Sequence, residues 1–337
     1  MISILTPTYN HEKYIGECIQ SALNQTFRDW EMIIVDDGST DRTAEIITGY
    51  GDPRIKYFAQ DHVGPWKLDQ TYNFALSKSS GKYIAILEGD DYWPPNKLKI
   101  QYAEMESHPE TILCYGESMM VSDSGREISY FDLPKEQEIL TNNPVGSSLH
   151  AFFNLNLFIQ AVTLVIKRSV LDKIGGFQYS KMIPAVDYPT SLRLCLEGSF
   201  LPIRGHCLGY WRRHMKSISI NYQMEAWRGM ANHNLKYLEN HREELIQLGI
   251  HFKQAEVQRK LEQKMDFVSV HHYYHSGFLF LTLKEYQLAR KMFLKYLLKN
   301  PNFREFVLTL LGLISTFLRM DLVHAYRNLR WKLRARK

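Results

Sequence analysis

Three carboxylates lie within four residues of the sequence, at Glu88, Asp90 and Asp91. They follow an apolar run, residues 83–87, whose composition predicts a buried strand. In an open α/β sheet, ligands bind at the carboxyl ends of the strands. Clustered carboxylates repel one another, and a hard divalent cation bridging them to phosphate oxygens offsets that cost. The pattern therefore predicts a Mg²⁺ and diphosphate site, and the alternative is a solvated acidic turn.

Two earlier apolar runs also end in polar residues. Residues 2–5 precede a loop, and residues 32–35 precede a second loop that begins with Asp36 and Asp37. Helical periodicity follows each loop, so we expect βαβ units and a mostly parallel sheet that brings all three loops to one edge. We expect Asp36 or Asp37 to accept a hydrogen bond from a nucleotide base. The first loop, which frames the base, consists of Thr6, Pro7, Thr8, Tyr9 and Asn10.

Residues 1–220 resemble family 2 glycosyltransferases of the GT-A fold. The resemblance rests on six motifs in family order: residues 5–10, 21–26, 34–41, 87–98, 175–177 and 210–214. It implies an α/β fold, with a Rossmann-like, mostly parallel twisted sheet flanked by helices. It also implies an inverting transferase of bacterial cell-surface polysaccharide type, with a nucleotide-sugar donor, most commonly UDP-linked, and a glycan or lipid-linked acceptor. The acidic loop then matches the family's DxD motif, which binds Mg²⁺ or Mn²⁺ and the donor diphosphate.

The sequence departs from the family pattern at two places. The family's usual Asp-Ser-Asp-Asp is Glu88-Gly89-Asp90-Asp91 here, so Asp90 and Asp91 match directly and the role of Glu88 is open. After Gly64 the family commonly has a short segment with an arginine, whereas residues 65–72 contain none. Lys67 is the candidate to supply that charge beside the nucleotide, and a surface lysine is the alternative.

The resemblance assigns chemistry to two later segments. Asp187 corresponds to the catalytic base, because the reaction needs a carboxylate that takes the proton of the acceptor hydroxyl. The alternative is an acid that interacts with a helix N-terminus. Arg212 and Arg213 are expected to neutralise the leaving diphosphate, and His214 to bind the metal. A purely structural histidine is the alternative there.

The C-terminal third, residues 221–337, changes to nearly continuous helical periodicity and forms the second predicted domain. Residues 273–301 resemble one tetratricopeptide-like helical hairpin, suited to packing or to a homodimer contact. Residues 306–318 carry an apolar stripe, and residues 319–337 contain seven Lys and Arg residues and one acid. This pattern predicts an interfacial anchor on an anionic membrane. A packed subdomain with a solvated basic tail is the alternative.

Composition limits the remaining choices. The 45% hydrophobic and 23% charged residues indicate a folded chain, and the net charge of +5 comes with no nucleic-acid motif. The four cysteines lack CxxC spacing and the start lacks a signal-peptide pattern, so we expect a cytoplasmic protein, peripheral on the inner face of the membrane. Two functions compete with transfer: a non-catalytic sugar-nucleotide-binding scaffold, which would be expected to lose these acids, and a nucleotidyltransferase, which needs a glycine-rich basic loop after the first strand.

Overall fold

The structure is a computed structural model that describes residues 1–133, 140–157, 159–299 and 301–319. The chain forms two compact units, Met1–Leu261 and Glu262–Lys337. This division falls later than the boundary predicted between residues 220 and 221. Residues 221–261 therefore belong to the first unit, in which Asn234 accepts a hydrogen bond from the Tyr188 hydroxyl at 3.0 Å.

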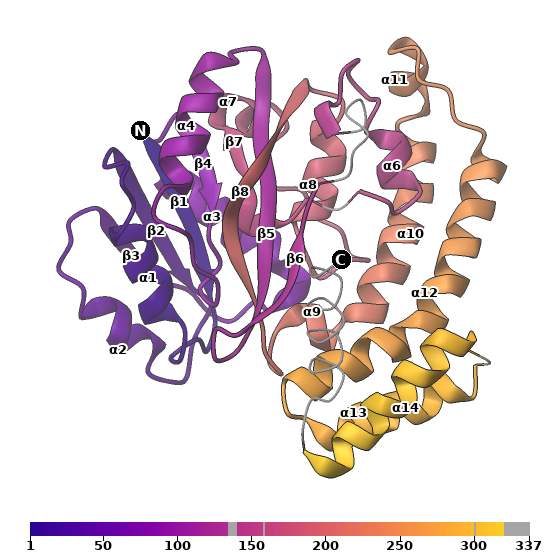
Figure 1. Cartoon of the computed structure of the whole chain (residues 1–337). Coiled ribbons are helices and arrows are strands. Elements are labelled where there is room, and N and C mark those ends of the chain that lie inside the picture. The colour runs from indigo at the N-terminus through magenta and orange to yellow at the C-terminus, as the bar shows by residue number, and fades with distance from the viewer. Residues whose placement is uncertain (134–139, 158, 300, 320–337) are drawn as a thin grey trace, which may run out of the picture. The chain divides into compact units, whose positions relative to one another are not determined.

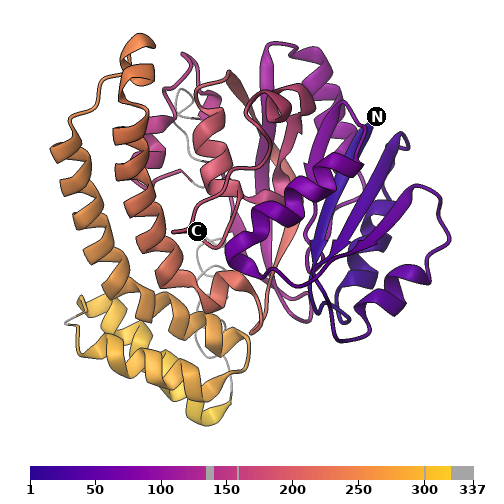
Figure 2. The same cartoon turned by 180° about the vertical axis from the view of Figure 1, so that it is seen from behind.

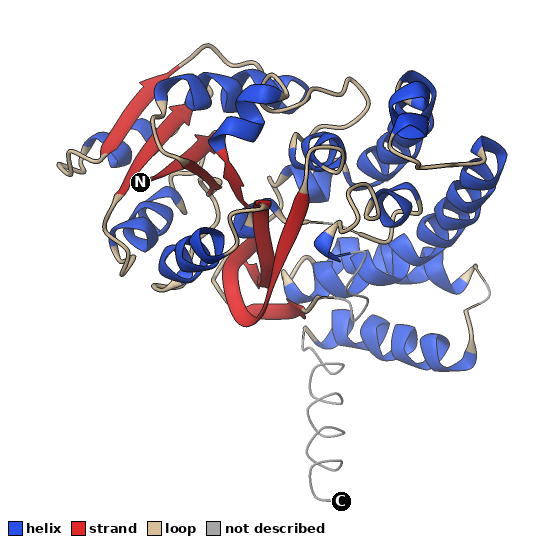
Figure 3. Cartoon of the chain, turned by 90° about the horizontal axis from the view of Figure 1, so that it is seen from above, coloured by secondary structure: helices blue, strands red, loops and turns tan. Residues whose placement is uncertain are grey.

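The first unit is built on one mixed sheet of eight strands among the described residues, in the order β3-β2-β1-β4-β7-β5-β6, with β8 paired to β5 (Figures 1 and 3). The first four strands are parallel, as the sequence predicts, β7 runs antiparallel to β4 and β5, and β8 is parallel to β5. The strands are β1 Ile2–Thr8, β2 Trp30–Asp36, β3 Ile55–Ala59, β4 Tyr83–Ile86, β5 Thr111–Ser122, β6 Glu127–Phe131, β7 Val165–Lys167 and β8 Ser199–Arg213.

Helices cover both faces of this sheet (Figure 3). The helices α1, α2 and α4 contribute to the hydrophobic core on one face, and α3 packs on β1 and β2 (Figure 2). The helices of the first unit are α1 Ile15–Leu23, α2 Thr43–Thr48, α3 Leu68–Lys78, α4 Lys97–Ser107, α6 Leu149–Phe153, α7 Arg168–Lys173, α8 Asp187–Leu194, α9 Ile218–Asn221, α10 Gln223–Asn240, α11 Arg242–Gln247 and the start of α12 Gln254–Thr282.

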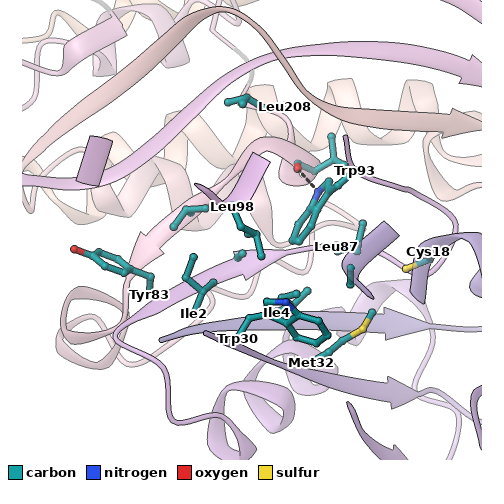
Figure 4. Packing of buried hydrophobic residues seen from close by; sticks show 14 of the residues in the cluster. Ile2, Ile4, Cys18, Trp30, Met32, Tyr83, Leu87, Trp93, Leu98 and Leu208 are labelled. Atoms are coloured by element: carbon teal, nitrogen blue, oxygen red, sulfur yellow. Dashed lines mark hydrogen bonds between the residues drawn. The ribbon is translucent and has the colours of Figure 1, made fainter. Parts of the chain in front are cut away.

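The core beneath the acidic loop fixes where that loop begins. Ile2 and Ile4 of β1 and Leu87 after β4 are fully buried together with Cys18 of α1 (Figure 4). Trp93, just beyond the acids, is also buried, and its indole N–H donates to the Val162 carbonyl at 2.8 Å. The loop is thus held at both ends by buried apolar residues.

In the second unit, α13 (Tyr286–Leu297) and α14 (Phe303–Leu318) lie side by side (Figure 1). Phe293 of α13 faces a glycine on each neighbouring helix, because a Cβ added to Gly277 or Gly312 would come within 2.5 or 2.6 Å of its ring. Residues 273–301, where the sequence predicts a helical hairpin, fall on the end of α12 and on α13. The basic segment predicted to bind a membrane lies, beyond Arg319, outside the described residues.

The side chain of Asn73 in α3 connects this helix to a distant turn. Its Nδ2 donates to the Phe177 carbonyl at 2.9 Å, and its Oδ1 accepts from the Phe177 N–H at 2.7 Å. Gly176 has φ +91°, and a Cβ there would collide with the Asn73 amide. Asn73 thereby holds the turn at residues 175–177.

Replacing Asn73 with alanine should destabilise the protein by about 1–3 kcal/mol, because both hydrogen bonds to Phe177 are lost. The melting temperature of Asn73→Ala measures the effect, and Gln70→Ala on the exposed side of the same helix is the control. Equal melting temperatures for the two variants would contradict the assignment.

Candidate active site

Three strand ends meet at one edge of the sheet, as the sequence predicts. Thr8 of β1 is paired with Asp36 of β2, and Leu5 of β1 with Ile86 of β4. Thr6, Pro7 and Thr8 continue β1 instead of forming a loop. Thr6 is fully buried, and its Oγ1 has no hydrogen-bond partner among the described residues. Thr6 therefore lies beneath the edge, and Tyr9 is the first exposed residue there.

Backbone hydrogen bonds fix the acidic loop onto β1 and β8. The Gly89 N–H donates to the Pro7 carbonyl at 3.0 Å. On the other side, the Arg212 N–H donates to Asp91 Oδ1 at 2.8 Å, and the rings of Tyr92 and Tyr210 stack with centroids 4.5 Å apart. The end of β8 is thus part of the site, although it lies far away in the sequence.

Asp90 faces two histidines. His214 Nε2 lies 2.9 Å from Asp90 Oδ2, and His11 Nε2 lies 4.0 Å from the same oxygen. Burial works to raise the pKa of Asp90, but the two imidazoles outweigh it and hold that pKa below its usual range. Ligand atoms of His11, Asp90 and His214 lie within 4.8 Å of one another, as do those of Glu88, Asp90 and Asp91. These donor sets suit a divalent cation.

The other two carboxylates have different surroundings. Glu88 Oε1 accepts a hydrogen bond from the Tyr72 hydroxyl of α3 at 2.7 Å. Burial, followed by the nearby Asp90 carboxylate, raises the pKa of Glu88, and burial with Asp90 and Glu88 raises that of Asp91 well above its usual range. The longer side chain at position 88 therefore reaches α3. Sequence reasoning missed this contact because Tyr72 carries no motif.

Asp187 begins α8, and its Oδ1 accepts the Tyr188 N–H at 2.8 Å. Burial raises the pKa of Asp187 to about 6, and its charge in turn raises the pKa of Glu88. The side chain is only partly covered. Asp187 thus lies at a helix start and also within electrostatic range of the acidic loop.

The predicted nucleotide-binding acids organise their own loops. Asp37 accepts the N–H groups of Val63 and Gly64 at 2.9 and 3.0 Å, and Gly64 adopts φ +75°. Asp36 Oδ1 accepts the Ser39 N–H at 2.9 Å, and its Oδ2 accepts the Tyr57 hydroxyl at 3.1 Å. The two carboxylates therefore shape the loops that border the strand edge.

Aromatic and basic side chains border the same loops. Tyr9 is 39% exposed and stacks on His62, with ring centroids 4.1 Å apart, so it presents a flat apolar face to solvent. Lys67, at the end of a short 3₁₀ helix (Pro65–Lys67), is exposed. Its exposure fits both the predicted charge beside the nucleotide and the alternative of a surface lysine.

Arg212 and Arg213 are both buried. The Nε of Arg212 donates to the Asp90 carbonyl at 2.8 Å, its Nη1 to the Asp123 carbonyl at 3.0 Å, and its Nη2 to Glu17. The guanidinium therefore supports the acidic loop. Arg213 Nη2 donates to the Ser219 carbonyl at 3.1 Å, and its buried Nε has no partner among the described residues.

The sequence and fold were compared with known proteins. The profile described as Glycosyl transferase family 2 matches residues 3–175. The chain belongs to glycosyl transferase family 2. This glycosyltransferase is 31% identical over 224 residues to TuaG of Bacillus subtilis, a glycosyltransferase assigned to teichuronic acid biosynthesis, covering 66% of this chain and 82% of TuaG.

A second relative and a solved structure extend the comparison. The glycosyltransferase is 37% identical over 222 residues to WfgD of Escherichia coli, named a UDP-Glc:alpha-D-GlcNAc-diphosphoundecaprenol beta-1,3-glucosyltransferase, covering 66% of this chain and 80% of WfgD. The structure of S. aureus TarS 1-349 with UDP-GlcNAc superposes with a TM-score of 0.56 at 19% identity, covering 97% of this chain and 91% of that one. The predicted fold and enzyme class, a glycosyltransferase of bacterial polysaccharide type, are therefore confirmed.

Arg212→Lys should lower the melting temperature, because one ammonium cannot replace the branched contacts to the Asp90 and Asp123 carbonyls and to Glu17. We expect a loss of about 1–3 kcal/mol, together with weaker nucleotide binding as the loop loosens. The control is Arg42→Lys, since Arg42 is exposed and forms an ion pair with Glu45 on the surface. A leaving-group role would instead leave the melting temperature of Arg212→Lys unchanged and reduce turnover.

Proposed function

We propose that this glycosyltransferase is an inverting, metal-dependent enzyme that moves a sugar from a UDP-linked donor to a hydroxyl of a glycan or lipid-linked acceptor. The observation that carries the proposal is the placement of Asp187, a single partly covered carboxylate with a raised pKa, within electrostatic range of the acidic loop. The name of WfgD includes UDP-Glc and the TarS structure contains UDP-GlcNAc, which supports a UDP donor.

In this proposal each group has one task. Asp187 accepts the proton of the acceptor hydroxyl while that oxygen attacks the anomeric carbon, and the bond from this carbon to the nucleoside diphosphate breaks. One displacement with one base inverts the configuration at that carbon. Asp90 and His214 would hold a Mg²⁺ or Mn²⁺ ion, which neutralises charge on the departing diphosphate. Tyr9 offers its exposed ring face to the nucleotide base of the donor, beside the loop organised by Asp37.

Asp187→Asn should reduce transfer by about 10²–10⁴-fold while leaving donor nucleotide binding near normal, because a general base acts on the acceptor. Asparagine also tolerates a helix start, so a purely structural acid would leave transfer intact. The transfer rate, nucleotide affinity and melting temperature of the variant separate the two roles. Glu110→Gln, an exposed acid before β5, is the control.

The same carboxylate sets the pH dependence. The raised pKa of Asp187, about 6, means that the base is protonated and inactive below this value. We therefore expect the transfer rate to rise as the pH increases through about 6 and to level off above it. Asp187→Asn should flatten this rise, whereas a rise that persists in the variant would assign the titration to another group.

We also propose that the enzyme binds peripherally to an anionic membrane through α14. Its buried side carries Thr309, Gly312, Ser315 and Thr316. Large apolar residues at the helical spacings of three, four and seven positions occupy the opposite side and are exposed: Phe303, Phe306, Val307, Ile314, Phe317 and Leu318. Basic residues follow in the sequence from Arg319 onward, as an anionic surface requires. Within the described residues, no helix has the length and apolarity to cross a bilayer.

Phe303→Gln combined with Ile314→Gln should weaken binding to vesicles that contain anionic lipid, since both side chains are exposed on this face at 84% and 48%. Co-sedimentation with anionic and neutral vesicles measures the effect. Tyr179→Gln, which removes an exposed aromatic ring from the first unit, is the control. A dimer in sedimentation analysis that the double variant dissociates, without any vesicle binding, would assign the face to a second copy instead.

A further inference from the structure

His11 lies in the loop after β1, and its imidazole faces the acidic loop. Its Nε2 is 4.0 Å from Asp90 Oδ2, the oxygen that His214 Nε2 approaches at 2.9 Å. The two imidazole rings are 6.1 Å apart and perpendicular to each other. One ligand atom from each of the three residues therefore lies close enough to the others for a single ion to contact all three.

The other side of the His11 ring is fixed by the protein. Its Nδ1 lies 3.1 Å from the Thr8 hydroxyl, and its backbone N–H donates to Thr43 Oγ1 at 2.8 Å. A histidine that binds a metal through one nitrogen commonly has its second nitrogen held by a neighbouring polar group, which orients the ring. Thr8 supplies that group here and leaves Nε2 directed toward Asp90.

Gly89 lies against the residue that holds the His11 ring. A Cβ at position 89 would come within 2.4 Å of Thr8 Oγ1, 2.7 Å of Thr8 Cβ and 2.9 Å of His11 Nδ1. The glycine therefore leaves room for the Thr8 hydroxyl and the His11 ring beside the acidic loop.

We propose that His11 is a metal ligand, so that His11, Asp90 and His214 form a site with two imidazoles and one carboxylate. Imidazole favours transition metals, whereas Mg²⁺ prefers oxygen ligands and a nearly complete oxygen shell. The site therefore selects Mn²⁺ or Co²⁺ over Mg²⁺. This inference rests on the metal dependence in the proposed function and adds a ligand and a selectivity to it.

The test measures Mn²⁺ binding to the full chain without substrate. Binding is monitored as the loss of the free Mn²⁺ signal in electron paramagnetic resonance, and competition with Mg²⁺ gives the relative affinity of the two ions. His11→Ala should weaken Mn²⁺ binding by at least about tenfold and leave Mg²⁺ binding nearly unchanged. His206→Ala, which removes an exposed imidazole, is the control. Unchanged Mn²⁺ affinity in a folded His11→Ala protein would overturn the inference.

A second variant tests the same idea without removing a ligand. Gly89→Ser should displace Thr8 and the His11 ring that Thr8 holds, and so lower the preference for Mn²⁺ over Mg²⁺. A preference equal to that of the unmodified chain would count against His11 as a ligand. His214→Ala separates the two proposals. If it abolishes Mn²⁺ binding and His11→Ala does not, only the role of His11 fails. If neither variant affects Mn²⁺ binding, the metal dependence itself fails.

Discussion

Mutual repulsion among three carboxylates at one sheet edge is the constraint around which this active site is built. Glu88, Asp90 and Asp91 are each given a different partner: the Tyr72 hydroxyl, the imidazoles of His11 and His214, and the Arg212 N–H. As a result their pKa values diverge, with that of Asp90 lowered and those of Glu88 and Asp91 raised. The two imidazoles favour the charged form of Asp90, which suits this carboxylate to bind a cation.

Each of these partners comes from a different element, so the constraint extends through the first unit. The strand β8 has to end beside the loop to bring Arg212 and His214 to it. Helix α3 has a double function through two consecutive residues, since Tyr72 binds Glu88 and Asn73 binds the Phe177 backbone. One helical turn therefore connects the acidic loop to the segment that leads to Asp187. A shift of α3 would change the distance between the acidic loop and Asp187.

The sequence predicts the parts of this site that depend on local patterns. Apolar runs followed by acids identified β2 and β4 and the edge at which Asp36 and Asp90 meet. Contacts between distant side chains carry no such pattern. His11 and Tyr72 belong to no motif, because each acquires its partner through the fold. The contacts of the Arg212 side chain also cannot be predicted from the sequence, since an arginine near acids can bind a ligand or support a loop.

The domain boundary also depends on contacts between residues that are distant in the sequence. Helical periodicity changes near residue 221, but periodicity does not say which surface a helix packs against. Gly229 of α10 allows close approach to Met182, because a Cβ there would lie 2.7 Å from the Met182 carbonyl carbon. Arg193 of α8 and Glu244 of α11 form an ion pair at 3.0 Å. These contacts, which join α10 and α11 to the first unit, arise from single residues within otherwise ordinary helices.

Helix α14 shows that packing geometry can override the usual sorting of apolar residues. Phe293 has to fit between Gly277 and Gly312, and a larger side chain at either glycine would force the helices apart. The inward side of α14 is therefore restricted to small residues such as Thr309 and Ser315. Large apolar residues such as Phe303 and Phe317 lie exposed on the outward side, where each Å² would contribute about 25 cal/mol if covered. The exposed stripe is thus a consequence of how the three helices meet, and a surface of this kind is stable in water only while its area stays modest or a partner covers it.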